Sequence, residues 1–154
     1  MHGVSWLAYL NDMAKLYFHY STMNAGKSTL LLQAAHNYHE QGMQTYLLTA
    51  ALDDRGGEGR IASRIGIGQS ADKFAPGEDL FAKVEARRAS GPIACMFVDE
   101  AQFLETTQVW QLARVVDDLR IPVLCYGLRV DFQGQLFPGS AALLALADEM
   151  REVR

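Results

Sequence analysis

The stretch that decides the fold of this chain is Leu16-Tyr-Phe-His-Tyr20-Ser21-Thr-Met-Asn-Ala-Gly-Lys27-Ser28. Its first five residues form an apolar run that predicts a strand, and residues 27–41 have the pattern of a helix. A tight turn from a strand into a helix aims consecutive backbone N–H groups and the positive end of the helix at one point, where a polyphosphate can bind. The candidate phosphate-binding residues of this turn are Ser21, Thr22, Met23, Asn24, Ala25, Gly26, Lys27 and Ser28.

Within this turn, Lys27 is expected to reach the outer phosphates, and the hydroxyl of Ser28 is expected to bind Mg²⁺. The usual pattern is G-x-x-x-x-G-K-[ST], and Ser21 stands here at the first glycine, whereas Gly26, Lys27 and Ser28 are as required. The order strand, turn, helix is the context that the pattern needs, so the stretch predicts nucleotide binding. The alternative is a Ser/Asn-rich turn that only caps the helix.

Composition limits the possible partners of the chain. Its 154 residues, 49% of them hydrophobic, are enough for one packed domain. A formal net charge of −4, without a Lys/Arg stripe, argues against nucleic acid as a partner. The apolar stretches are too short to span a bilayer and no secretory signal opens the chain, so we expect a cytoplasmic protein with no membrane partner.

Two further features concern the cysteines and the first residues. Cys95 and Cys125 both lie in apolar runs, so we expect buried, non-catalytic thiols and no zinc site. Met13 reads like a natural start just before the first strand. We therefore expect residues 1–12 to be a loosely ordered extension that precedes a nucleotide-binding core at 13–154.

Apolar, β-rich runs alternate along the chain with runs of helical period, which predicts an α/β fold with parallel strands and helical crossovers. We expect strands at residues 15–20, 45–49, 93–98 and 123–126, and helices at 27–41, 78–89, 106–119 and from 140 onward. Gly42 is expected to end the first helix in the left-handed conformation. In the helix at 106–119, Trp110 is expected to pack rather than to stack on a base.

A second candidate site is Val98-Asp-Glu100, at the end of an apolar strand. Ligands of doubly wound sheets bind at the carboxyl ends of strands, so these acids are expected beside the phosphate-binding turn if the first and third strands are neighbours. Asp99 would hold Mg²⁺, directly or through water, and Glu100 would accept a proton from the attacking hydroxyl or water. The alternative is that both acids only cap the following helix.

A third candidate site is Asp53-Asp-Arg55, which follows the second strand on the same edge of the sheet. Arg55 is a candidate for stabilising charge on the transferring phosphoryl group, and Asp53 for holding Arg55 or binding metal through water. The alternative is a solvated loop with local ion pairs. Arg60 and Arg64 are weaker candidates for the same role, and surface solvation is the expectation for them.

These motifs, in this order and spacing, resemble the type II thymidine kinases, particularly the bacterial branch. The segments that carry the resemblance are 21–29, 53–55, Val98-Asp-Glu-Ala-Gln-Phe103 and the loop 126–140. It covers about residues 13–154, and four linked motifs are far more specific than one phosphate loop. The resemblance implies a P-loop, RecA-like core with a mostly parallel sheet flanked by helices. It also implies transfer of the γ-phosphoryl group of ATP to the 5′-hydroxyl of thymidine or deoxyuridine, with Mg²⁺.

The resemblance implies a role for each matching residue. Glu100 would be the general base, and Lys27, Ser28 and Asp99 would serve the phosphates and the metal, with Asp53 and Arg55 at the same end of the site and Gln102 among the ATP contacts. Met23, Phe103, Leu128 and Phe132 match positions that line the thymine pocket, where a pyrimidine needs flat apolar walls. The alternative for these four is core packing, which is the expectation for Phe137.

Two alternatives to a complete kinase stay open at this point. One is a phosphate-loop ATPase in which Glu100 activates water; the other is an ATP-binding core that joins oligomers without catalysis. We expect the chain to be truncated before the zinc module and the flexible nucleoside-covering segment of the family, and such a core is expected to bind ATP but to lose much of its turnover. The family also implies a homo-oligomer, typically a tetramer.

Overall fold

A computed structural model describes residues 14–21, 27–51, 60–62 and 68–153, with backbone alone at 27–29, 60–62 and 68–70. Its centre is a sheet of six strands in the order β5-β2-β6-β7-β1-β8, in which every neighbouring pair is parallel. The strands are β1 (Leu16–Ser21), β2 (Thr45–Ala50), β5 (Asp72–Phe74), β6 (Cys95–Val98), β7 (Val123–Leu128) and β8 (Glu149–Glu152). A separate antiparallel pair joins β3 (Arg60–Ala62) to β4 (Gly68–Ser70). This architecture confirms the predicted α/β class.

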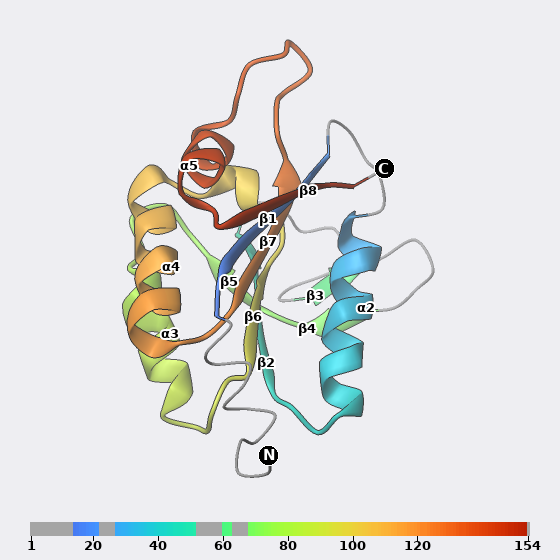
Figure 1. Cartoon of the computed structure of the whole chain (residues 1–154), viewed down its shortest axis with the longest axis vertical. Helices are drawn as coiled ribbons and strands as arrows, with labels where there is room; N and C mark the ends of the chain where they lie inside the picture. The colour runs from blue at the N-terminus through green and yellow to red at the C-terminus, as the bar shows by residue number, and fades with distance from the viewer. Residues whose placement is uncertain (1–13, 22–26, 52–59, 63–67, 154) are drawn as a thin grey trace.

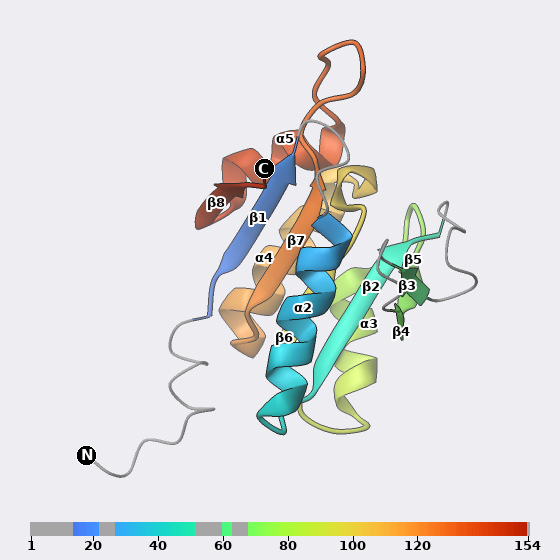
Figure 2. The same ribbon diagram turned by 90° about the vertical axis from the view of Figure 1, so that its right-hand side faces the viewer.

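Helices cover both faces of the sheet (Figure 1). One face carries α2 (Lys27–Glu40); the other carries α3 (Leu80–Arg88), α4 (Thr106–Leu119) and α5 (Pro138–Leu146), as the turned view also shows (Figure 2). A single turn of 3₁₀ helix, η1 (Ala101–Phe103), links β6 to α4. Parallel strands need such crossovers because each chain segment must return to the starting edge of the sheet before the next strand begins.

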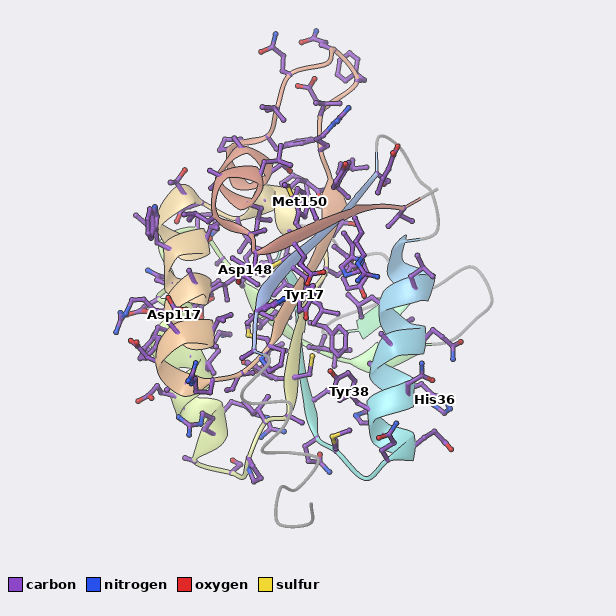
Figure 3. The ribbon with its side chains drawn as sticks, in the orientation of Figure 1. Tyr17, His36, Tyr38, Asp117, Asp148 and Met150 are labelled. Carbon is purple, nitrogen blue, oxygen red and sulfur yellow. The ribbon has the colours of Figure 1, made fainter. Side chains whose placement is uncertain are left out.

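The core is divided by the alternation of side chains along the strands. Leu48, Val98 and Val123 pack with α3, α4 and α5, whereas Leu47 and Phe97 pack with α2. All residues of β2 and β6 are buried, as expected for strands covered on both faces. On α2, Tyr38 points toward the sheet and meets the ring of Phe97 edge-on at 5.9 Å between centroids, while His36 points to solvent (Figure 3).

Several predicted boundaries are confirmed to within a few residues, and that of α4 matches the prediction at both ends. Gly42 adopts a φ of +76° after α2, as predicted for a residue that ends a helix. Trp110, in contrast, is 56% exposed, so the prediction that it packs into the core is wrong. The expectation of a helix from residue 140 to the end of the chain is also wrong beyond Leu146, because Glu149–Glu152 pair with β1 as a sheet edge.

The strand order corrects one expectation about the site. The first and third predicted strands, β1 and β6, are not neighbours, because β7 lies between them. Adjacent strands are spaced by about 4.8 Å, so the ends of β1 and β6 are separated by roughly twice that distance.

No helix of the described residues is long and apolar enough to cross a membrane. The expectation for residues 1–12 falls outside the described part of the chain and stays a prediction.

Candidate functional site

The candidate site lies where β6, β7 and β1 end, at one edge of the sheet. Ser21 pairs in register with Leu128, and Val98 pairs with Cys125, so the acids that follow β6 come close to the end of β7. The N–H of Arg129 donates to the carbonyl oxygen of Ser21 at 2.9 Å, which ties the end of β7 to the end of β1. Three chain segments that are far apart in the sequence therefore meet at this edge.

Glu100 has an unusual backbone at this edge. Its φ of +56° and ψ of +41° place it in the left-handed region, although it carries a full side chain and is 4% exposed. Its N–H donates to Oδ1 of Asp99 at 2.9 Å. Such a conformation costs about 1–3 kcal/mol and persists where the surrounding structure enforces it, often at functional sites. The other described non-glycine residue with positive φ is Arg120, which ends α4, an ordinary place for it.

Gln102 lies two residues after Glu100 in η1 and is 3% exposed. Its Nε2 donates to Oε2 of Glu100 at 2.7 Å, and its Oε1 accepts from the N–H of Leu128 at 3.1 Å. A single amide side chain thus connects the acidic turn, which consists of Asp99 and Glu100, to the end of β7. The bond to Glu100 is buried and has a carboxylate as its acceptor, so it belongs to the stronger class of hydrogen bonds, whereas the bond from Leu128 is part-buried and joins two neutral groups.

Two glycines make room for this turn. A Cβ atom on Gly127 would lie 2.7 Å from Oε1 of Gln102 and 2.9 Å from its backbone nitrogen. A Cβ atom on Gly139, at the start of α5, would lie 2.5 Å from the carbonyl oxygen of Leu104 and 2.7 Å from that of Ala101. The 3₁₀ turn η1, which directly follows Asp99 and Glu100, is therefore packed against the end of β7 and the first turn of α5 at distances that only glycine allows.

The first turn of α5 also holds β7. The hydroxyl of Ser140, which is fully buried, donates to the carbonyl oxygen of Leu128. Gly127, Gly139 and Ser140 lie in the stretch 126–140 that carries the family resemblance, but no individual role was predicted for them. A glycine directly after the buried Tyr126 and a Pro-Gly-Ser start of a helix were the available signals, but neither says which backbone lies opposite.

The alternative that Asp99 and Glu100 cap the helix at 106–119 is wrong. The N-cap of α4 is Glu105, which forms a capping box with Gln108, and the N–H of Glu105 donates to Oε1 of Gln108 at 3.0 Å. Gln108 also donates to the carbonyl oxygens of Ala75 and Glu78, at 2.9 and 3.1 Å. The amino-terminal end of α4 is thus capped by Glu105 and Gln108 rather than by the two acids.

The phosphate-binding turn is described only at its two ends. Ser21 ends β1 and is 1% exposed, and α2 begins at Lys27 as predicted, with its amino-terminal end toward the same edge (Figure 1). The positive end of a 14-residue helix thus faces the candidate site. Outside the described residues lie Thr22, Met23, Asn24, Ala25, Gly26, Asp53 and Arg55, together with the side chains of Lys27 and Ser28.

The four candidates for an apolar pocket are distributed differently. Leu128 is half-buried at the end of β7, and Phe103 is 40% exposed in η1, with its ring edge-on to Phe137 at 6.0 Å between centroids. Phe132 is 87% exposed in the loop between β7 and α5, which projects from the body of the molecule (Figure 1). Phe103 and Leu128 therefore flank the acidic turn, whereas Phe132 is not packed against them here; Met23 is outside the described residues.

A cavity of about 340 Å³ lies elsewhere, beside the start of β2. Its lining includes His39, Tyr46, Asp72 and Arg87, none of which is a candidate site residue. The carboxyl end of β2, at Ala50, is the end that belongs to the candidate edge. Within the described ranges, no group of three or more His, Cys, Asp and Glu side chains is arranged to hold a metal ion.

Comparison with known proteins gives consistent results. The thymidine kinase family model matches residues 14–154. The thymidine kinase of Ruegeria pomeroyi is 76% identical over 142 residues, which are 92% of this chain and 72% of that protein. The thymidine kinase of a Jannaschia species is 73% identical over 92% of this chain and 73% of its own length. A solved structure of a DNA replication initiation factor matches 96% of this chain and 42% of its own length, with 14% sequence identity and a TM-score of 0.49.

Proposed function

The chain belongs to the thymidine kinase family, and from this premise we propose that it transfers the γ-phosphoryl group of ATP to the 5′-hydroxyl of thymidine or deoxyuridine. The observation that best supports a site for this reaction is Glu100, a buried carboxylate in a left-handed backbone conformation at the carboxyl edge of a parallel sheet. That edge is where doubly wound α/β proteins bind their ligands.

Glu100 is proposed to act as the general base. Its carboxylate accepts the proton of the 5′-hydroxyl as the nucleoside oxygen forms a bond to the γ-phosphorus of ATP. The bond between that phosphorus and the oxygen bridging to the β-phosphate breaks, and ADP leaves with the electron pair. A positioned base contributes about 10²–10⁴-fold to the rate of such a step. The carboxylate has to be held in a fixed orientation, because a misoriented carboxylate would lose most of this rate enhancement.

The ATP phosphates are proposed to bind at the turn from Ser21 to Ser28, against the start of α2, with Lys27 at the outer phosphates. Mg²⁺ would be held by the Ser28 hydroxyl and the Asp99 carboxylate, and when bound it neutralises charge on the transferring phosphoryl group. Buried Asp99 supplies the hard oxygen donor that Mg²⁺ prefers, so the residues present fit this metal. Asp53 and Arg55 are proposed to serve the same end of the site, and Gln102 to lie among the ATP contacts.

The thymine ring is proposed to bind between apolar side chains beyond the phosphates. Phe103 and Leu128 flank the acidic turn, and Met23 and Phe132 are proposed to complete the walls. Because Phe132 is 87% exposed, its participation requires the loop between β7 and α5 to fold toward the nucleoside. Such closure would exclude water from the phosphoryl group and suppress ATP hydrolysis.

The setting of the reaction is also a proposal. The family resemblance supports a cytoplasmic homo-oligomer, typically a tetramer. A net charge of −4 gives no support for nucleic acid as a partner. Thymidine and ATP are thus the proposed ligands, without nucleic-acid or membrane partners.

Glu100→Gln tests the proposed function directly. We expect thymidine monophosphate formation to fall by about 10²–10⁴-fold, because the amide cannot accept the proton, while the affinity for Mg-ATP measured by calorimetry stays within about twofold. Glu85→Gln is the matched control, because Glu85 is an exposed residue of α3 that pairs with Arg88, and it should leave the rate unchanged.

Two outcomes would contradict the proposal. A Glu100→Gln variant with near-normal turnover would show that this carboxylate is not the base. Hydrolysis of ATP by the unmodified chain at a rate that thymidine does not alter, without thymidine monophosphate as product, would show that the protein is an ATPase rather than a nucleoside kinase.

A further inference from the structure

We infer that Gln102 is a positioning residue, which fixes the carboxylate of Glu100 relative to the nucleoside-binding end of β7. The inference rests on the proposed function, because it takes Glu100 as the base and Leu128 as part of the nucleoside pocket. It adds a role that the acidic motif alone does not indicate. The basis is the pair of hydrogen bonds from one buried amide, to Oε2 of Glu100 at 2.7 Å and from the N–H of Leu128 at 3.1 Å.

The orientation of this amide is determined by the protein. A backbone N–H can only donate, so the atom of Gln102 that faces the N–H of Leu128 must be its oxygen. The Nε2 group then faces Glu100 and can only donate, so its partner must be a carboxylate oxygen. The usual ambiguity between oxygen and nitrogen of an amide therefore does not arise here. Leu128 acts through Gln102 to set where the carboxylate of Glu100 can rest.

The side chain of Gln102 is also confined sterically. Gly127 approaches it so closely that a Cβ atom there would lie 2.7 Å from Oε1, and the backbone of η1 is pressed from the other side by Gly139. At 3% exposure, water has little access to replace either hydrogen bond. The side chain of Gln102 is therefore restricted to one conformation, and only a restricted side chain can hold the carboxylate of Glu100 in a fixed position.

The positioning of Glu100 by Gln102 is expected to affect the rate of phosphoryl transfer more than the binding of ATP. One oxygen of the carboxylate is held by Gln102, which orients the whole group about its last torsion angle toward the nucleoside. The same amide is anchored to the backbone of Leu128, a residue proposed to contact the thymine ring. The distance between Leu128, in the wall of the nucleoside pocket, and the carboxylate of Glu100 is therefore set through the side chain of Gln102. A small error in that distance would lower kcat substantially.

Gln102→Met tests the inference, because methionine has a similar length but makes neither hydrogen bond. We expect kcat for thymidine monophosphate formation to fall by about 10–100-fold, as for other residues that orient a functional group. Gln33→Met is the matched control, since Gln33 is exposed on α2 and its amide donates to Oδ1 of Asn37 at 3.4 Å, away from the candidate site. It should leave kcat unchanged.

A double-mutant comparison separates positioning from a structural role. Glu100→Asp shortens the base and withdraws it from Nε2 of Gln102, so adding Gln102→Met to that variant should cost less than about threefold. A purely structural glutamine would cost the same factor in both backgrounds, and that result would overturn the inference. If Gln102→Met fails to fold, Gln102→Leu serves instead, because leucine is also apolar, makes neither hydrogen bond and adds no charge beside Glu100.

The two proposals fail in different ways. Absence of thymidine phosphorylation by the unmodified chain would overturn the proposed function itself. Normal turnover in a folded protein that carries Gln102→Met or Gln102→Leu would overturn only the positioning role.

Discussion

Replacement of Gly139 by alanine should both destabilise the fold and slow the reaction. The new Cβ atom would lie 2.5, 2.7 and 3.0 Å from the carbonyl oxygens of Leu104, Ala101 and Gln102. These are backbone atoms, so no side chain can rotate away. The clash therefore has to be relieved by moving the start of α5 away from the acidic turn.

The size of the effect follows from these distances. A carbon and a carbonyl oxygen rest at about 3.3 Å or more, so the closest contact has to open by about 0.8 Å. Overpacking of this kind costs about 1–3 kcal/mol of unfolding free energy. For a chain of this length each kcal/mol lowers Tm by about 2–4 °C, which predicts a fall of roughly 2–12 °C. Because Gln102 is one of the displaced residues, kcat should fall at least tenfold.

Guanidinium denaturation and a thymidine monophosphate assay at saturating ATP measure the two effects. Gly42→Ala is the control, because nothing lies within 4 Å of a Cβ atom there, although its φ of +76° is unfavourable for alanine. It should lose about 1 kcal/mol and keep its kcat, since Gly42 follows α2 far from the acidic turn. A Gly139→Ala protein as stable and as active as the control would refute the steric argument.

Two further predictions concern buried groups. Burial raises the pKa of Cys95 to about 12 and holds the pKa of Cys125 well above its usual range, so native protein at pH 8 should resist iodoacetamide and label only on denaturation; rapid labelling of the native protein would contradict this. Burial, and then the charge of Arg151, lower the pKa of His19 from its usual 6.5, so the unfolded state takes up a proton first as the pH falls and stability declines below about pH 6.5. His19→Phe keeps a ring against Tyr126, which stacks on His19 at 4.5 Å, and should reduce the loss of unfolding free energy between pH 7.5 and 5.5; an unchanged loss would count against the assignment.

The sequence predicted best what depends on local pattern. The bounds of α4 follow from its hydrophobic periodicity, and the buried strands β2 and β6 from continuous apolar runs. The edge strand β8 was missed because Glu149–Glu152 carry mostly charged side chains, and only pairing with β1 makes them a strand. Trp110 shares the helical spacing of its neighbours, but periodicity does not reveal that the side chain extends beyond the packed face.

For the site, the motif placed Glu100 correctly at the end of a strand, but it could not supply the strand order or the contacts. That β7 separates β1 from β6 is a property of the whole sheet. The left-handed conformation of Glu100 and the bridge through Gln102 depend on glycines in two other segments, so they become visible only when those segments are brought together.

The hydrogen bonds at the end of β7 have a practical consequence for library design. Position 129 is tied to Ser21 by its amide proton, not by its side chain. Randomising this codon should therefore return many different amino acids among functional clones, with proline depleted because it has no such proton. A library that allows only residues similar to arginine at position 129 would be restricted needlessly, whereas a library that leaves out proline alone would respect the backbone hydrogen bond.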